Sequence, residues 1–93
     1  MATTTASVKT ENASRYLQQL CKHWSHKFKV EFTPQSGGIE FGETTHVGLT
    51  ASDSELDVVI TADDASELPR VAEVVENHIV RFAFREELVF DWK

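Results

Sequence analysis

Apolar residues recur every three to four positions in two parts of the chain, and at every second position in most of the rest. The first helical pattern covers residues 13–25, and the second begins near Ser66 and continues to residue 82. Each pattern draws one apolar stripe along a helix and leaves the remaining faces polar. The stripes consist of Ala13, Tyr16, Leu17, Leu20 and Trp24 in the first helix and of Leu68, Val71, Ala72, Val75, Ile79 and Phe82 in the second. Both stripes therefore need a sheet to cover them.

Alternation with a period of two predicts strands before, between and after these helices. The predicted strands span residues 6–9, 28–32, 39–41, 45–50, 56–61 and 88–93. The unbroken run Val58-Val59-Ile60 favours a central strand that is covered on both faces. Thr10 or Asn12 is the expected cap of the first helix, and residues 63–67 supply capping groups for the second.

The resulting order, β-α-β-β-β-β-α-β, predicts an α+β domain with two helices packed on one face of a mainly antiparallel sheet. A chain of 93 residues has room for one core, so we expect a single domain over residues 1–93. The small polar residues 1–5 are expected to be frayed. This order resembles the TATA-binding-protein-like fold and the C-terminal domain of phosphohexomutases. Neither activity is carried over, because the basic, intercalating and phosphate-binding residues that those proteins use are missing here.

Charge is unevenly distributed along the chain. The net charge is −6, yet residues 1–30 hold five basic residues and one acidic residue. An acidic protein with a mildly basic first helix does not have the strongly basic surface of nucleic-acid binders. Such a dipolar surface can orient a protein partner, which makes Lys22 and Lys27 candidate contact residues.

The single cysteine and the absence of long apolar runs indicate in which cellular compartment the protein is expected. Cys21 has no second cysteine to pair with, and it lies beside the apolar stripe, where thiols behave as small buried hydrophobes. The N-terminal residues show no charged region leading into an apolar run. No stretch approaches the ~20 apolar residues that cross a bilayer. We therefore expect a cytoplasmic protein that does not span a membrane.

The chain contains no recognisable catalytic or cofactor motif. It has neither a Gly-x-Ser-x-Gly nucleophile motif nor a glycine-rich phosphate loop before a helix, so we expect no enzyme activity and no cofactor. Arg81 and Arg85, near Glu86 and Glu87, admit two interpretations. They form an anion or partner site, or they form ion pairs that hold the second helix against the last strand.

Two histidines stand three residues apart on the first helix. At this spacing His23 and His26 share one flank of a helix, as in a pair that brackets a metal ion. Two imidazoles are too few for a stable site, so a third ligand must come from elsewhere. Candidates by residue type are His46, His78, Glu31 and Glu40. The alternative is that His23 packs at the edge of the core and His26 is exposed near the end of the helix.

Three longer segments carry a family resemblance. They are residues 15–28, residues 38–42, and residues 81–88 followed by Trp92. With these segments the chain resembles the bacterial family known as domain of unknown function 2218. The resemblance spans nearly the whole chain and implies no established activity. Related domains that lie beside, or are fused to, flavin-dependent siderophore-interacting reductases imply an accessory part in ferric-siderophore handling.

Two functional hypotheses follow. The favoured one is a non-enzymatic accessory or protein-interaction domain, with a siderophore-interacting flavin reductase or another protein as partner. Its contact surface includes the basic flank of the first helix and the turn His23-Trp24-Ser25-His26, and it predicts no metal affinity in the isolated protein. The alternative is a small-ligand or metal-binding protein, in which Trp24, Phe41 and Trp92 wall a pocket and histidines supply polar contacts.

Overall fold

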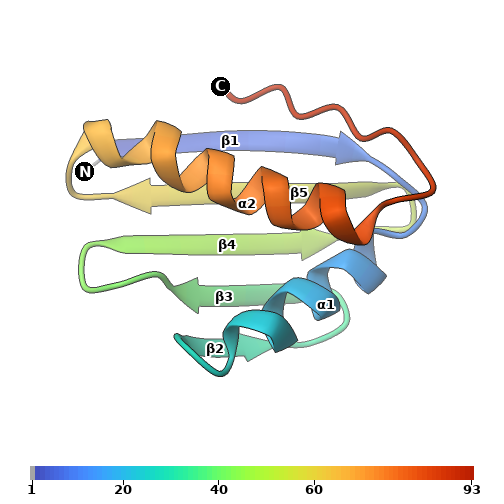
Figure 1. Cartoon of the computed structure of the whole chain (residues 1–93), viewed down its shortest axis with the longest axis horizontal. Helices are drawn as coiled ribbons and strands as arrows, with labels where there is room; N and C mark the ends of the chain where they lie inside the picture. The colour runs from blue at the N-terminus through green and yellow to red at the C-terminus, as the bar shows by residue number, and fades with distance from the viewer. Residues whose placement is uncertain (1) are drawn as a thin grey trace.

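A computed structural model describes residues 2–93 as five strands and two helices that form two layers (Figure 1). The elements are β1 (Ala2–Lys9), α1 (Ala13–Trp24), β2 (Lys29–Phe32), β3 (Ser36–Glu40), β4 (Thr45–Ala51), β5 (Glu55–Ala62), the 3-10 turn η1 (Ala65–Glu67) and α2 (Leu68–Phe82). The strands make one fully antiparallel sheet in the order β1-β5-β4-β3-β2. The predicted fold class is confirmed.

Both helices cover the same face of the sheet. In Figure 1, α2 runs along β5, while α1 crosses the β3 and β2 side, and the two helices meet near the start of α1 and the end of α2. The predicted apolar stripes are the buried faces: Leu17 and Leu20 of α1, and Val75 and Ile79 of α2, are fully buried. Cys21 is buried with them, and burial raises the pKa of its thiol to about 11. It therefore remains a protonated, inert thiol at neutral pH.

No helix of residues 2–93 covers the opposite face of the sheet, which corrects one prediction. Val58 and Ile60 of β5 are fully buried, but Val59 between them is 41% exposed. A run of three β-branched residues predicted burial on both faces. Instead, side chains alternate across the sheet, and the face that holds Val59 is open to solvent.

The N-terminal strand is longer than expected, so the prediction of a frayed terminus is wrong for residues 2–5. These residues pair with residues 59–62 of β5 in the same register as the rest of β1. Threonine has a high strand propensity, and pairing with β5 satisfies the backbone of this Thr-rich segment. Met1 lies outside the described residues.

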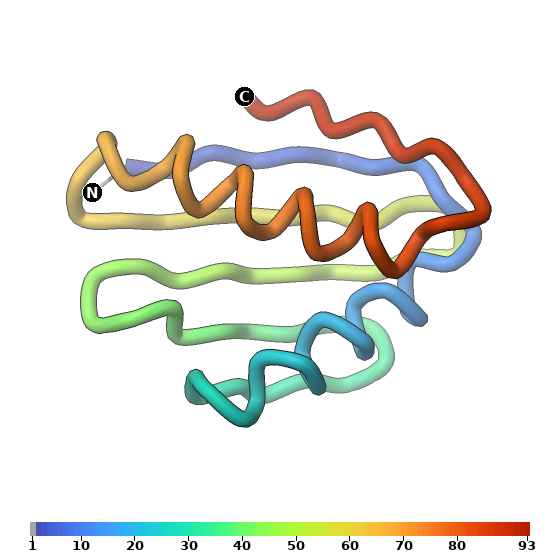
Figure 2. The backbone as a smooth tube through the Cα atoms, in the orientation of Figure 1, coloured from blue at the N-terminus to red at the C-terminus, as the bar shows by residue number. Residues whose placement is uncertain are grey.

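The C-terminal segment is extended and joins the sheet at one point only. Figure 2 shows it running beside β1, where Thr5 and Lys93 exchange two backbone hydrogen bonds of 2.9 and 3.3 Å. Residues 88–92 keep the predicted alternation: Leu88, Phe90 and Trp92 are half-buried against the core. The regular sheet thus has five strands, and the segment predicted as a last strand is held mainly by its side chains.

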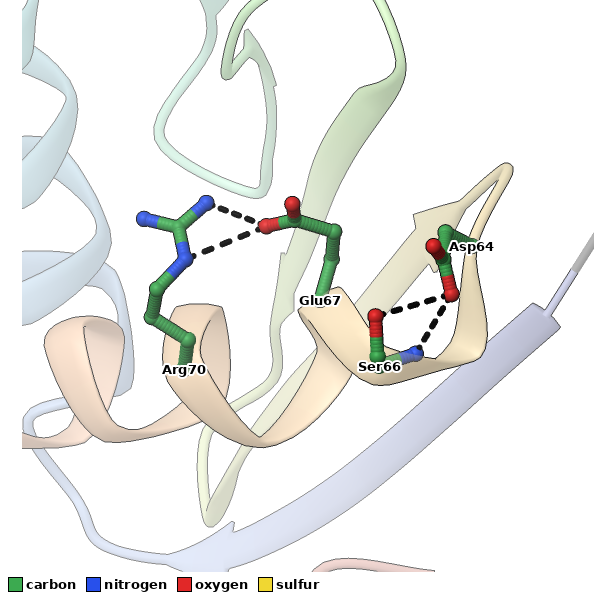
Figure 3. A network of polar contacts seen from close by, with 4 residues as sticks. All are labelled: Asp64, Ser66, Glu67 and Arg70. Atoms are coloured by element: carbon green, nitrogen blue, oxygen red, sulfur yellow. Dashed lines mark hydrogen bonds and ion pairs between the residues drawn. The ribbon is translucent and has the colours of Figure 1, made fainter.

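Polar residues fix the start of the second helix (Figure 3). Asp64 accepts hydrogen bonds of 2.9 Å from both the backbone N–H and the hydroxyl of Ser66. The backbone bond is the main reason that the pKa of Asp64 is lowered. Glu67 then pairs with Arg70 one turn later. Of the predicted capping residues 63–67, Asp64 therefore caps the 3-10 turn η1 that leads into α2, whereas Glu67, at the N-cap of α2 itself, makes no capping hydrogen bond with its side chain.

Gly37 lets α1 pack closely on β3, and this gives a first prediction. A Cβ at Gly37 would lie 2.8 Å from Cys21 Sγ and 3.3 Å from Phe32 Cβ, whereas at Gly48 of β4 nothing lies nearer than 3.8 Å. We expect Gly37→Ala to lower the free energy of unfolding by about 1–3 kcal/mol through overpacking. Gly48→Ala is the matched control and should be neutral or slightly stabilising. Equal denaturation midpoints for the two variants would contradict the close approach of α1.

Candidate functional site

The exposed side of α1 is a basic surface. Arg15, Gln19 and Lys22 follow one another at helical spacing and are exposed, and His26 and Lys27 continue the surface into the turn after the helix. We call these five residues the basic face of α1. Its position follows from the apolar stripe, because burial of Tyr16, Leu17 and Leu20 leaves the other side of the helix to solvent.

The cations of this region have no carboxylate partners in the described part of the chain. Within residues 2–93, only two ion pairs have N–O distances up to 4.0 Å, namely His46–Glu40 and Arg70–Glu67. Arg15, Lys22 and Lys27 therefore remain unpaired in a protein whose net charge is −6. The positive charge predicted for the first helix is thus available to an external acidic group.

The arginines at the end of the second helix, Arg81 in its last turn and Arg85 just after it, do not form the predicted ion pairs. Arg81 and Arg85 are exposed, and no carboxylate of residues 2–93 lies within 4.0 Å of either side chain. The guanidinium of Arg85 instead stacks on the ring of Phe84 at 5.3 Å. Phe84 is 78% exposed, so this end of the molecule presents an aromatic ring and an arginine together.

The histidines are arranged differently from the predicted pair. Helix α1 ends at Trp24, so His26 lies in the following turn, and the ring of His23 faces His78 of α2 at a centroid distance of 5.2 Å. His78 Nδ1 lies 2.7 Å from the Val74 carbonyl oxygen, which accepts its proton in the corresponding tautomer. Among residues 2–93, no three His, Cys, Asp or Glu side chains converge to hold a metal ion.

Two of the three predicted pocket aromatics contact each other, and the third lies elsewhere. The Trp24 ring packs against Phe41 at 5.0 Å and against His78 at 4.9 Å. Trp92 instead donates a hydrogen bond of 2.9 Å from Nε1 to Glu76 on α2. These ring contacts occupy the space that a pocket between Trp24 and Phe41 would need.

A polar cluster that the sequence did not reveal joins the start of α1 to the end of the chain. One Glu86 carboxylate oxygen accepts hydrogen bonds from the Tyr16 hydroxyl and from Asn12 Nδ2 (2.9 Å), and the Thr10 hydroxyl lies 3.0 and 3.1 Å from the two oxygens. Thr10 in turn accepts the backbone N–H of Asn12 at 3.1 Å, so it organises the turn before the helix. These contacts connect residues 70 to 76 positions apart.

The cluster shifts the pKa values of its acidic members in opposite directions. The hydrogen bonds from Tyr16 and then Asn12 lower the pKa of Glu86, because they stabilise its charged form. Burial, and then the hydrogen bond to Glu86, raises the pKa of Tyr16. One signal for this cluster was available in the sequence: Tyr16 lies on a buried stripe, and a buried phenol needs a hydrogen-bond partner. Its partner could not be found from spacing.

The cluster borders a cavity of about 640 Å³ at this end of the molecule. Lys9, Arg15 and Arg85 also line it, together with the exposed Phe84. Glu86 is already engaged with its three donors, whereas these cations have no carboxylate within 4.0 Å among residues 2–93. Arg15 thus belongs both to the cavity and to the basic face of α1.

The fold and these surfaces define a small two-layer α+β domain with a basic helical surface, an open sheet face and no converging metal ligands among residues 2–93. The chain belongs to the family described as "Uncharacterized protein conserved in bacteria (DUF2218)", whose model matches residues 5–93. The predicted family resemblance is confirmed. This family carries no assigned activity, so membership does not decide between the two functional hypotheses.

A solved structure shares the fold over the full chain. The NMR structure of PA4090 from Pseudomonas aeruginosa is 39% identical, covers 100% of this chain and 96% of its own, and superposes with a TM-score of 0.85. Comparison with curated proteins finds no match. Within residues 2–93, neither helix is long and apolar enough to cross a membrane.

Proposed function

We propose that the protein is a non-enzymatic accessory domain that binds an acidic surface of a partner protein through the basic face of α1. The observation that carries this proposal is the set of exposed cations without carboxylate partners, Arg15, Lys22 and Lys27, on a chain of net charge −6. Fifteen acidic residues are available in the chain, yet none lies within 4.0 Å of these cations among residues 2–93. A surface of this kind favours oriented encounter with a partner of opposite charge.

The end of the molecule beside this face supplies an apolar contact. Phe84 is 78% exposed and is stacked by Arg85, and Arg15 lines the same cavity as both residues. Exposed aromatic and arginine side chains are the residue types that dominate binding energy at protein interfaces. A partner that covers the basic face near Arg15 would also reach Phe84.

The first partner to test is a siderophore-interacting flavin reductase, which the family resemblance suggests. The alternative function, a pocket built from histidines and aromatics, has less support. It needs Trp24, Phe41 and Trp92 around one space, whereas Trp24 and Phe41 pack on each other and Trp92 bonds to Glu76. It also needs a third metal ligand beside His23 and His26.

Charge reversal on the basic face gives the test. Lys22→Glu/Lys27→Glu should weaken binding to the reductase by about tenfold or more at low salt, because two attractive contacts become repulsive. The remaining binding should also depend less on salt concentration. Titration calorimetry at two ionic strengths measures both effects.

The control changes the net charge equally at a distant site. Arg70 and Lys93 are exposed and lie away from α1, so Arg70→Glu/Lys93→Glu should leave the affinity within about twofold. Equal weakening by both double variants would mean that only net charge matters. Unchanged affinity of the Lys22/Lys27 variant at low salt would place the contact elsewhere.

A further inference from the structure

The two edges of the sheet differ in their cover. On the β1 edge, the C-terminal segment exchanges two backbone hydrogen bonds with Thr5. On the other edge, β2 (Lys29–Phe32) has β3 on one side and no strand of residues 2–93 on the other. An uncovered edge strand offers unpaired backbone groups to another chain.

The register of the hairpin shows which backbone groups are unpaired. Beyond the end of β2, the Thr33 N–H donates to the Ser36 carbonyl at 2.7 Å, which continues the β2–β3 pairing. Hydrogen-bonded and non-bonded pairs alternate along an antiparallel ladder. The backbone groups of Glu31 and Lys29 therefore point to β3, and those of Val30 and Phe32 point to the open edge.

The side chains of β2 also fall into two sets. Lys29 and Glu31 are exposed on the open face of the sheet. Val30 and Phe32 are half-buried on the helix side, as is Phe28 just before the strand. The edge thus combines one positive and one negative side chain with an apolar row that α1 covers only in part.

We infer that β2 pairs with β2 of a second copy of this chain, antiparallel about a twofold axis at Val30. This register places Lys29 of each copy opposite Glu31 of the other, so that two ion pairs form. The two Val30 residues become a hydrogen-bonded pair, which uses the backbone groups that point outward. Lys29 and Glu31 then occupy non-bonded positions, where facing side chains come closest.

The apolar row supports the same register. With the axis at Val30, Phe32 of one copy comes opposite Phe28 of the other, on the helix side of a continuous ten-stranded sheet. Phe28 lies just before β2 and its N–H is bonded to the Trp24 carbonyl at 2.8 Å, so this contact is between side chains. Cross-strand aromatic pairs stabilise a sheet, and here each ring is only half-buried in the single chain. Association would cover the part of Phe28, Val30 and Phe32 that α1 leaves exposed.

Neighbouring registers are disfavoured. An axis at Glu31 would set two Glu31 carboxylates opposite each other at a non-bonded position, where facing side chains come closest. An axis at Phe32 would bring Pro34 opposite Val30, and proline has no N–H to donate. Of these three registers, only the axis at Val30 sets opposite charges face to face and keeps proline away from a bonding position.

The contact is small, so the dimer should be weak and concentration-dependent. A standard interface buries about 800 Å² on each partner, more than a four-residue edge offers by itself. Sedimentation equilibrium of the full chain from about 10 µM to 1 mM spans the range expected for such a contact. We expect a reversible monomer–dimer equilibrium within this range.

A charge swap tests the register. Lys29→Glu and Glu31→Lys should each weaken dimerisation by about tenfold, because each creates two like-charge pairs across the axis. The double variant Lys29→Glu/Glu31→Lys restores both ion pairs and should return the dissociation constant to within about threefold of the original. Both side chains are exposed, so the fold is retained. This pairing would be refuted if the single variants weakened dimerisation and the double variant did not restore it, or if neither single variant had an effect.

Amide exchange gives an independent readout in the unmodified protein. Dimerisation should slow exchange of the Val30 N–H as concentration rises, because it gains an acceptor. The Glu31 N–H, which already points to β3, is the internal control and should not change. A protein that stays monomeric to 1 mM, or equal concentration dependence at both amides, would overturn the inference.

Discussion

Glu86→Ala should lower the free energy of unfolding by about 2–3 kcal/mol. The carboxylate accepts hydrogen bonds from Tyr16 and Thr10, two residues that are only 5% and 6% exposed. Removing it leaves two part-buried hydroxyls without their acceptor, and an unsatisfied buried donor costs about 1–3 kcal/mol. Because 1 kcal/mol shifts the melting temperature of a domain of this size by about 4–8 °C, a drop of about 10–20 °C is expected.

The neighbouring glutamate provides the control for this prediction. Glu87 is exposed and makes no side-chain hydrogen bond or ion pair within residues 2–93. Glu87→Ala removes the same charge one residue away and should change stability by no more than about 0.5 kcal/mol. Comparable melting temperatures for the two variants would show that the polar cluster contributes little.

The lowered pKa of Glu86 predicts how the stability lost on replacing this residue depends on pH. A carboxyl group whose pKa is lower in the folded state contributes stability above its unfolded pKa, about 4.3 for glutamate. That contribution is lost as pH falls through the folded pKa. The gap in stability between the unmodified protein and Glu86→Gln should therefore be largest near neutral pH and shrink below about pH 4. If this stability difference stayed constant down to acidic pH, it would be due to packing and not to the charge of Glu86.

The helices and most strands were predictable because burial on one face leaves a direct trace in the sequence. Leu17, Leu20 and Trp24 recur at helical spacing because the same face of α1 meets the sheet throughout. The residue types in a strand predicted its burial less well than the alternation of its side chains between the two faces of the sheet. The Val58-Val59-Ile60 run predicted a doubly covered strand, yet Val59 lies on the open face, where Thr5 and Gly48 are its cross-strand partners.

Contacts between distant segments could not be predicted from spacing. Glu86 meets Tyr16 because the end of α2 and the start of α1 come together in space, and 70 residues separate them in the chain. The same crossing of the helices brings His78 to His23, whereas the sequence paired His23 with His26. The positive charge of α1, by contrast, could be predicted, because the excess of basic residues is visible in the sequence. The structure adds that no carboxylate within residues 2–93 lies close enough to neutralise it.

The C-terminal segment is held on the core mainly by its apolar side chains and not by regular strand pairing, and its contribution to stability can be measured. Deleting residues 88–93 should lower the free energy of unfolding by about 3 kcal/mol and the melting temperature by about 10–20 °C. The deletion exposes the core surface under three half-buried apolar residues, Leu88, Phe90 and Trp92. It also removes the hydrogen bond from Trp92 to Glu76 and the two backbone bonds between Lys93 and Thr5.

Inward and outward side chains alternate along the C-terminal segment, so substitutions can test whether its packing on the core, and not merely its presence, stabilises the fold. Phe90→Ala/Trp92→Ala removes inward side chains and should reproduce most of the destabilisation caused by the deletion. Val89→Ala/Asp91→Ala changes two exposed positions of the same segment and should leave the melting temperature nearly unchanged. Thermal unfolding followed by circular dichroism compares the variants directly. If the inward pair were as neutral as the outward pair, the segment would not be packed on the core, because only its side chains distinguish the two variants.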